Sequence, residues 1–202
     1  MMLPRKGIRA GAVLAGLICV IAPGAHSRAA RAAEQAQPVE DPAAVRPDWQ
    51  TADRGAMLGV SRLSPGQVHA FYRARGFDSE AAAEYAAACV FQMVLRNDAA
   101  GGTIASRLAD WRIRTAAGTQ RFVPLEAWER EWSRRGVSEA AHIAFRWAQF
   151  PPLQDFAPGD WIMGMVALTP RPKGKFELDY TWSIDGISHR GTLRGLECAA
   201  GD

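Results

Sequence analysis

Residues Lys175 to Cys198 read KFELDYTWSIDGISHRGTLRGLEC, and this stretch predicts a β-hairpin. Large apolar residues alternate with polar residues from Phe176 to Ile184. That period is typical of a strand with one buried face and one solvated face. Asp185-Gly186 follows at once, and this dipeptide favours a two-residue type I′ turn because both of its positions accept a positive φ.

The turn also predicts the register of the hairpin. A two-residue loop places Ile184 opposite Ile187, and every later pair follows from that one. The other expected pairs are Trp182–His189, Tyr180–Gly191, Leu178–Leu193 and Phe176–Gly195 on one face, and Glu177–Arg194 and Asp179–Thr192 on the other. Aromatic rings over glycines, and a carboxylate opposite an arginine, stabilise a sheet by roughly 0.2 to 1 kcal/mol per pair.

The beginning of the chain predicts export. Basic residues precede the short apolar run Ala10–Ala22, and Ala30-Arg31-Ala32 resembles a signal-peptidase site. We therefore predict a signal peptide over residues 1–32, a mature chain that starts near Ala33, and no stable membrane anchor after cleavage. The expected location is periplasmic or secreted.

Cleavage would also change the charge. Five of the 24 Lys and Arg residues lie in residues 1–32 and none of the 21 acids does, so the mature chain keeps 19 cations and its net charge moves from +3 to about −2. The basic character of the whole chain therefore comes from the signal peptide. It gives no support for nucleic acid as a partner, and none is expected.

Two of the three cysteines, Cys89 and Cys198, follow the predicted cleavage site. Two thiols in an oxidising compartment predict a disulfide. The competing interpretation is a thiolate metal or redox site, which the absence of a C-x-x-C spacing disfavours.

The rest of the chain divides into a linker and one domain. Residues 33–56 are rich in proline and polar residues and predict a disordered linker, and residues 57–202 are long enough for one domain. That domain should start with a helical segment at about residues 64–88, in which Ser64-Pro65-Gly66-Gln67 reads as a capping box. A strand is preferred for Cys89–Arg96, although a continued helix also fits its spacing.

Further alternating stretches predict more strands, over residues 103–115, His142–Phe150 and Trp161–Leu168. A helix is expected between Pro124 and Gly136. Short strands separated by turns, with a disulfide, favour an immunoglobulin-like antiparallel β-sandwich with short N-terminal helices and one inserted helix. The fold class is therefore mainly β.

One possible metal site follows from strand geometry. Met163 and Met165 should point the same way because alternate residues share a face. Thioethers suit Cu(I), and His189 on the apolar face of the hairpin is a conceivable third ligand. The simpler interpretation is that all three side chains fill the core.

No catalytic group can be assembled from the spacing of nucleophiles, bases or carboxylates, so we expect no enzyme and no cofactor. Trp111, Trp147 and Trp182 are expected at core positions of strands, and Trp128 and Trp132 on one stripe of the inserted helix. The sequence favours a non-catalytic exported binding or accessory protein that docks on another exported protein. A periplasmic Cu(I) chaperone or carrier is the main alternative, and a small hydrolase or sugar-binding domain with exposed tryptophans is a third.

Overall fold

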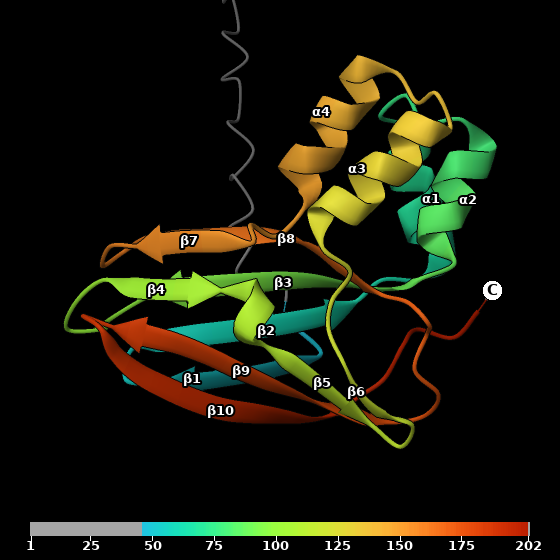
Figure 1. Cartoon of the computed structure of the whole chain (residues 1–202). Coiled ribbons are helices and arrows are strands. Elements are labelled where there is room, and N and C mark those ends of the chain that lie inside the picture. Colours follow the sequence, from blue (N-terminus) through green and yellow to red (C-terminus); the bar gives the residue numbers. More distant parts are fainter. Residues whose placement is uncertain (1–45, 202) are drawn as a thin grey trace, which may run out of the picture. The chain divides into compact units, whose positions relative to one another are not determined.

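The computed structural model describes residues 46–201 (Figure 1). This part of the chain is mainly β, with two antiparallel sheets and four α-helices. The strands are β1 (Trp49–Asp53), β2 (Ala56–Arg62), β3 (Cys89–Asn97), β4 (Ile104–Arg107), β5 (Arg112–Thr115), β6 (Gly118–Gln120), β7 (Leu153–Phe156), β8 (Trp161–Leu168), β9 (Phe176–Ile184) and β10 (Ile187–Leu196). The helices are α1 (Pro65–Arg73), α2 (Ser79–Ala86), α3 (Leu125–Arg134) and α4 (Glu139–Ala148), with a short 3-10 turn at Leu108–Asp110. The predicted signal peptide and residues 33–45 of the predicted linker lie outside the described residues.

The first sheet has the strand order β1-β2-β3-β8. All of its neighbours are antiparallel, and β3 pairs with β8 along its length, from Cys89 opposite Leu168 to Arg96 opposite Trp161. Cys89–Asn97 is therefore a strand, and the helical continuation that its spacing also allowed is wrong.

The second sheet is built around β9. β10 pairs with one side of β9, and β5 and β4 pair with successive parts of its other side. β6 pairs with the other edge of β5, and β7 pairs with the other edge of β4. The single strand expected over residues 103–115 is thus two strands, because the 3-10 turn at Leu108–Asp110 interrupts it.

The predicted hairpin register is confirmed from Ile184–Ile187 through Glu177–Arg194. Asp185 and Gly186 both have positive φ, 47° and 82°, as the turn requires. Gly191 is needed opposite Tyr180, since a Cβ at that position would lie 2.0 Å from the tyrosine hydroxyl oxygen. The prediction fails at one pair, because a bulge at Gly195 places Leu196 opposite Phe176.

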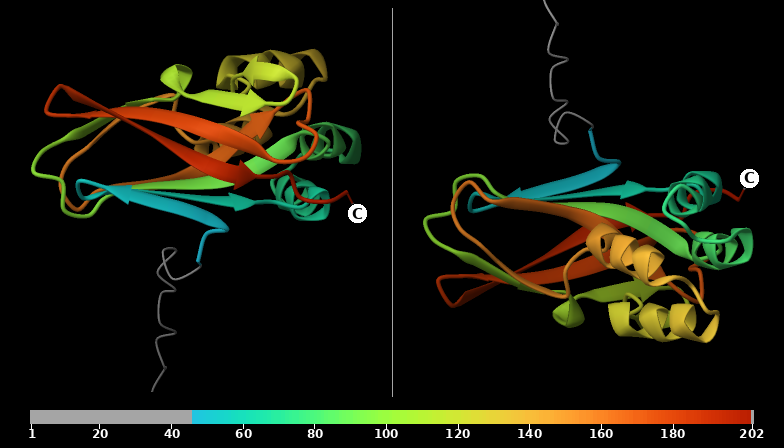
Figure 2. Two further views of the ribbon diagram at one scale, coloured as in Figure 1. Left: turned by 90° about the horizontal axis from the view of Figure 1, so that it is seen from below. Right: turned by 90° about the horizontal axis from the view of Figure 1, so that it is seen from above.

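Two hydrophobic cores share the first sheet. The two sheets enclose one core, in which Phe91 of β3 meets Phe176 of β9 with ring centroids 5.9 Å apart. The second core lies among the α-helices, which gather at one end of the strands (Figures 1 and 2), and it includes Val90 of β3 and Ala167 of β8. Because successive side chains of a strand point to opposite faces, β3 contributes to both cores.

The predicted linker ends earlier than expected. Residues 49–53 form β1, and β2 begins at Ala56. Trp49 anchors β1 against the core through an edge contact with Phe91. Gln50 and Ala52 occupy the exposed face of this short edge strand.

The strand expected over His142–Phe150 is wrong, because Glu139–Ala148 is helix α4. Ser138 caps this helix by accepting a hydrogen bond from the backbone N–H of Ala141. Ala141 and Phe145 face the helical core at a spacing of four residues. As part of a strand, Trp147 was expected in a core. Its side chain is instead 85% exposed. The inserted segment accordingly contains two α-helices, α3 and α4, in place of one.

Asn97, the last residue of β3, binds the loop between β3 and β4 and the end of β7. Its buried side-chain amide donates to the carbonyl oxygens of Gly102, at 2.9 Å, and Phe156, at 3.0 Å. Its side-chain oxygen accepts from the N–H of Ala100 at 3.1 Å. The two sheets are thereby joined at the end opposite the helices, through backbone groups that would otherwise be buried without partners.

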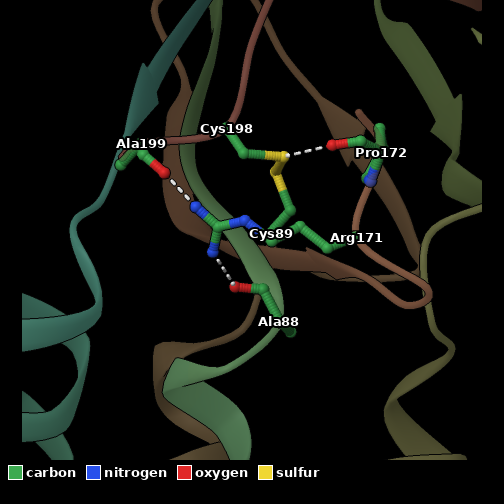
Figure 3. The surroundings of a disulfide bond; sticks show 6 residues. All are labelled: Ala88, Cys89, Arg171, Pro172, Cys198 and Ala199. Atoms are coloured by element: carbon green, nitrogen blue, oxygen red, sulfur yellow. Dashed lines mark hydrogen bonds between the residues drawn. A yellow bond between two sulfur atoms is a disulfide. The ribbon is translucent and has the colours of Figure 1, made fainter. Parts of the chain in front are cut away.

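The predicted disulfide is present between Cys89 and Cys198, whose Sγ atoms lie 2.09 Å apart (Figure 3). It joins the start of β3 to the segment after β10. Two further strands, β1 and β2, precede Cys89. Arg171 adds a second tie, since its guanidinium donates to the carbonyl oxygens of Ala88 and Ala199 (Figure 3).

Removing the disulfide in a Cys89→Ala/Cys198→Ala variant should lower the free energy of unfolding by about 2 to 5 kcal/mol, because the unfolded chain regains the freedom of a long closed loop. Urea denaturation of the exported protein and the variant measures this. An Arg171→Gln variant, which keeps the disulfide, separates the contribution of the arginine. Equal denaturation midpoints for parent and cysteine variant would contradict a stabilising role.

Candidate functional site

An open groove of about 490 Å³ lies between α1 and α4, over the outer face of β3 and β8. Its size falls in the range of sites that bind small molecules or short segments. The residues that line it are Leu63, Gln67, Val68, Phe71, Arg75, Gln92, Ala144, Trp147, Ala148, Met163, Gly164 and Met165. Most of them are apolar, and Arg75 is the one charged residue in this set.

Small side chains on α4 leave the groove open. Ala144, Trp147 and Ala148 lie on one stripe of the helix, because positions three and four residues apart are neighbours. The two alanines leave space opposite Phe71 of α1, and Trp147 stands at the rim with its ring in solvent. A large exposed tryptophan next to an apolar groove is typical of a binding surface.

A chain of hydrogen bonds fixes the wall and floor of the groove. The Tyr85 hydroxyl donates to Oε1 of Gln149 at 3.0 Å, and Nε2 of Gln149 donates to the Tyr72 hydroxyl oxygen at 2.8 Å. The Tyr72 O–H lies 3.5 Å from Sδ of Met165 and donates to it. The chain therefore connects α1 and α2 to the floor strand β8 through the residue that follows α4.

Both of these tyrosines are held in the neutral form. Burial removes the hydration that a phenolate would need, and it raises the pKa of Tyr72 and of Tyr85 far above the ordinary value of 10.0. Gln149 partly opposes this effect at both hydroxyls. The two hydroxyls consequently act as structural donors at neutral pH.

Arg75 lies just past the end of α1 and is held over Phe71. Its Cζ is 3.3 Å from the centroid of the phenyl ring, and Nη1 donates to the Phe71 carbonyl oxygen at 3.0 Å. Stacking and one hydrogen bond together fix the guanidinium in place.

The structure brings together two of the three predicted copper ligands. Met163 and Met165 point to the same side of β8 and both line the groove. Each sulfur already accepts a hydrogen bond, from Nε2 of Gln92 at Met163 and from Tyr72 at Met165.

His189 is not part of this site. It lies on β10 of the second sheet, opposite Trp182, whose side chain belongs to the core between the sheets. The first sheet therefore separates it from the two methionines. Within residues 46–201, no cluster of three or more His, Cys, Asp or Glu residues is arranged to hold a metal ion.

Sequence reasoning missed the α4 side of the groove because it treated that segment as a strand. A usable signal was present: Ser138 followed by Glu139, with Ala141, Phe145 and Ala148 at helical spacing, is typical of a capped amphipathic helix. Within the described part of the chain, none of the helices has the length and apolar character needed to cross a membrane.

The buried tyrosines predict a loss of stability in alkali. The pKa values of both tyrosines are raised in the folded state, so the unfolded chain loses its tyrosine protons first, near pH 10. The stability that the tyrosines contribute below that pH is therefore lost as the pH rises. Each tyrosine adds up to about 1.4 kcal/mol per pH unit to this loss.

A Tyr72→Phe/Tyr85→Phe variant should be less stable than the parent at pH 7, because Gln149 loses its partners, yet its stability should fall less steeply between pH 10 and 11.5. Urea denaturation across this range measures both slopes. Parallel pH profiles for parent and variant would show that these hydroxyls are not the groups responsible.

We compared the chain with models of known protein families, with curated proteins and with solved structures, and no family model, curated protein or solved structure matches it.

Proposed function

We propose that this protein is a non-catalytic, exported binding or accessory protein that holds an apolar segment of another exported protein in the groove between α1 and α4. The observation that carries the proposal is the groove itself, with Trp147 exposed at its rim. Tryptophan is among the residues that contribute most to protein–protein binding.

The floor of the groove supports the same function. Met163 and Met165 present flexible, polarisable thioethers, which adapt to apolar partners of different shape. Met163 is partly exposed, and Trp161 continues the same face of β8 beyond the groove with a 48% exposed side chain. A partner could therefore bury apolar surface that now contacts water.

Export is part of the proposal. The Cys89–Cys198 pair fits an oxidising compartment, and a signal peptide over residues 1–32 would deliver the chain to the periplasm or the outside of the cell. The immunoglobulin-like class expected from the sequence also stays a prediction, since two antiparallel sheets and a disulfide occur together in other folds.

Site-specific photo-crosslinking in the producing cells tests the docking site. A photoreactive amino acid at Gln67, which lines the groove, should form a discrete adduct with one exported protein. The same amino acid at Gln154, on exposed strand β7 of the second sheet, is the control and should not form this adduct.

Trp147→Ala should weaken this adduct strongly, because removing a tryptophan that a partner buries commonly costs 2 kcal/mol or more, or about 30-fold in affinity. Ile187→Ala removes another exposed apolar side chain, at the hairpin turn, and should change nothing. Equal adducts at Gln67 and Gln154, or an adduct that survives Trp147→Ala, would overturn the proposed site.

A Cu(I) carrier is the second candidate, and one observation favours it: Met163 and Met165 share the groove. Each thioether keeps a lone pair beyond the one that accepts its hydrogen bond. An ion bound here would have to take any third ligand from the partner or from solvent, because His189 lies on the other sheet.

Competition with a chromophoric Cu(I) chelator tests this candidate. One-to-one binding should disappear in Met163→Leu/Met165→Leu, which keeps the volume of both side chains, and should persist in His189→Ala. Met57→Leu, on the same face of the sheet but at β2, is the matched control. Failure to compete, or equal binding by all variants, would exclude copper at these methionines.

A further inference from the structure

Arg75 is a cation without an internal counter-ion. Within residues 46–201 it makes no ion pair, whereas Arg62, Arg114, Arg135 and Arg146 all meet carboxylates. Its contacts are the ring and carbonyl oxygen of Phe71, and these use one of the five N–H donors of a guanidinium. The side chain is exposed, and its remaining donors are unused at one end of the groove.

The position of this charge matters because the rest of the lining is neutral. A guanidinium with unused donors favours a carboxylate, which it can bind through two parallel hydrogen bonds. Apolar walls around the pair would strengthen it by excluding water. The groove therefore combines an apolar surface with one site for a negative charge.

We propose that the segment held in this groove carries an aspartate or glutamate side chain that pairs with Arg75, next to the apolar side chains that fill the rest of the groove. This inference rests on the proposed function, since it specifies the partner of the same site. The groove would then recognise a short apolar motif of the partner that has one acidic residue at a defined end.

The helix sets the spacing of that motif. Gln67, Phe71 and Arg75 follow one another at intervals of four residues along α1 and just past its end. A rise of 1.5 Å per residue places Gln67 and Arg75 about 12 Å apart along the helix axis. An extended segment covers that distance in roughly four residues, so the acidic residue should lie about four positions from the apolar residue near Gln67.

Two amides can hold the backbone of such a segment. Oε1 of Gln67 accepts from the N–H of Ser64, and Nε2 of Gln92 donates to Met163. Among the described residues, Nε2 of Gln67 and the side-chain oxygen of Gln92 make no hydrogen bond. One donor and one acceptor are thus left for main-chain groups of the partner.

Peptide selection tests the inference. The exported protein selects binders from a random peptide library displayed on phage, in which the carboxyl terminus of each peptide is fused to the coat protein. The expected consensus contains large apolar residues and one Asp or Glu about four positions from the first of them. A synthetic consensus peptide and its acid-to-amide counterpart (Glu→Gln or Asp→Asn) are then titrated by calorimetry, with the parent protein and with Trp147→Ala.

Arg75→Gln should weaken the acidic peptide about 10- to 100-fold and the amide peptide less than about 3-fold, so that the preference for the acid disappears. Arg112→Gln is the matched control, because Arg112 also donates to backbone carbonyls without an acidic partner but lies on the second sheet. It should leave both affinities unchanged.

The outcomes separate this inference from the proposed function. Apolar peptides that require Trp147 but show no acidic preference, or an acidic preference that survives Arg75→Gln, would overturn the role of Arg75 and leave the groove as the docking site. Selection that yields no peptide dependent on Trp147 would overturn both.

Discussion

The pairing of β3 with β8 is the constraint on which the rest of this structure depends. Both strands have one face in the core between the sheets, and at one end their other face must also be covered, because Val90 and Ala167 lie there side by side. The four α-helices provide that cover. They do not extend over the whole outer face, and the part left open, from Gln92 to Met163, becomes the floor of the groove. The groove is thus a consequence of how far the second core reaches.

An uncovered apolar surface of this kind stays open only if its walls are anchored elsewhere. Tyr72 and Phe145 hold α1 and α4 in the helical core, with ring centroids 5.4 Å apart, and Gln149 joins the end of α4 to both buried tyrosines. The alanines of α4 are too small to reach across to α1. Collapse of the groove would require breaking this buried network, which costs more than leaving a few apolar side chains in water.

The features that sequence predicted are the local ones. The hairpin register followed from a period of two and a two-residue turn, and it failed only at Gly195, where a bulge adds one residue to β10. Helix α4 was missed because Ile143, Phe145 and Trp147 alternate like a strand, although Ser138 can cap a helix in which Ala141 and Phe145 pack in the helical core. The groove could not be predicted, since it joins α1 to a segment about seventy residues later whose secondary structure was misassigned.

Met163 and Met165 lie together, as their spacing predicted, whereas His189 lies apart from them on the second sheet. Residues two apart on one strand share a face whatever the fold, so the methionine pair needed no tertiary information. His189 was added because it also lies on an apolar face, and sequence alone does not say which of several apolar faces meet. Here two such faces lie on opposite sides of the first sheet. Any site inferred by combining apolar faces of different strands needs the sheet order before its ligands can be counted together.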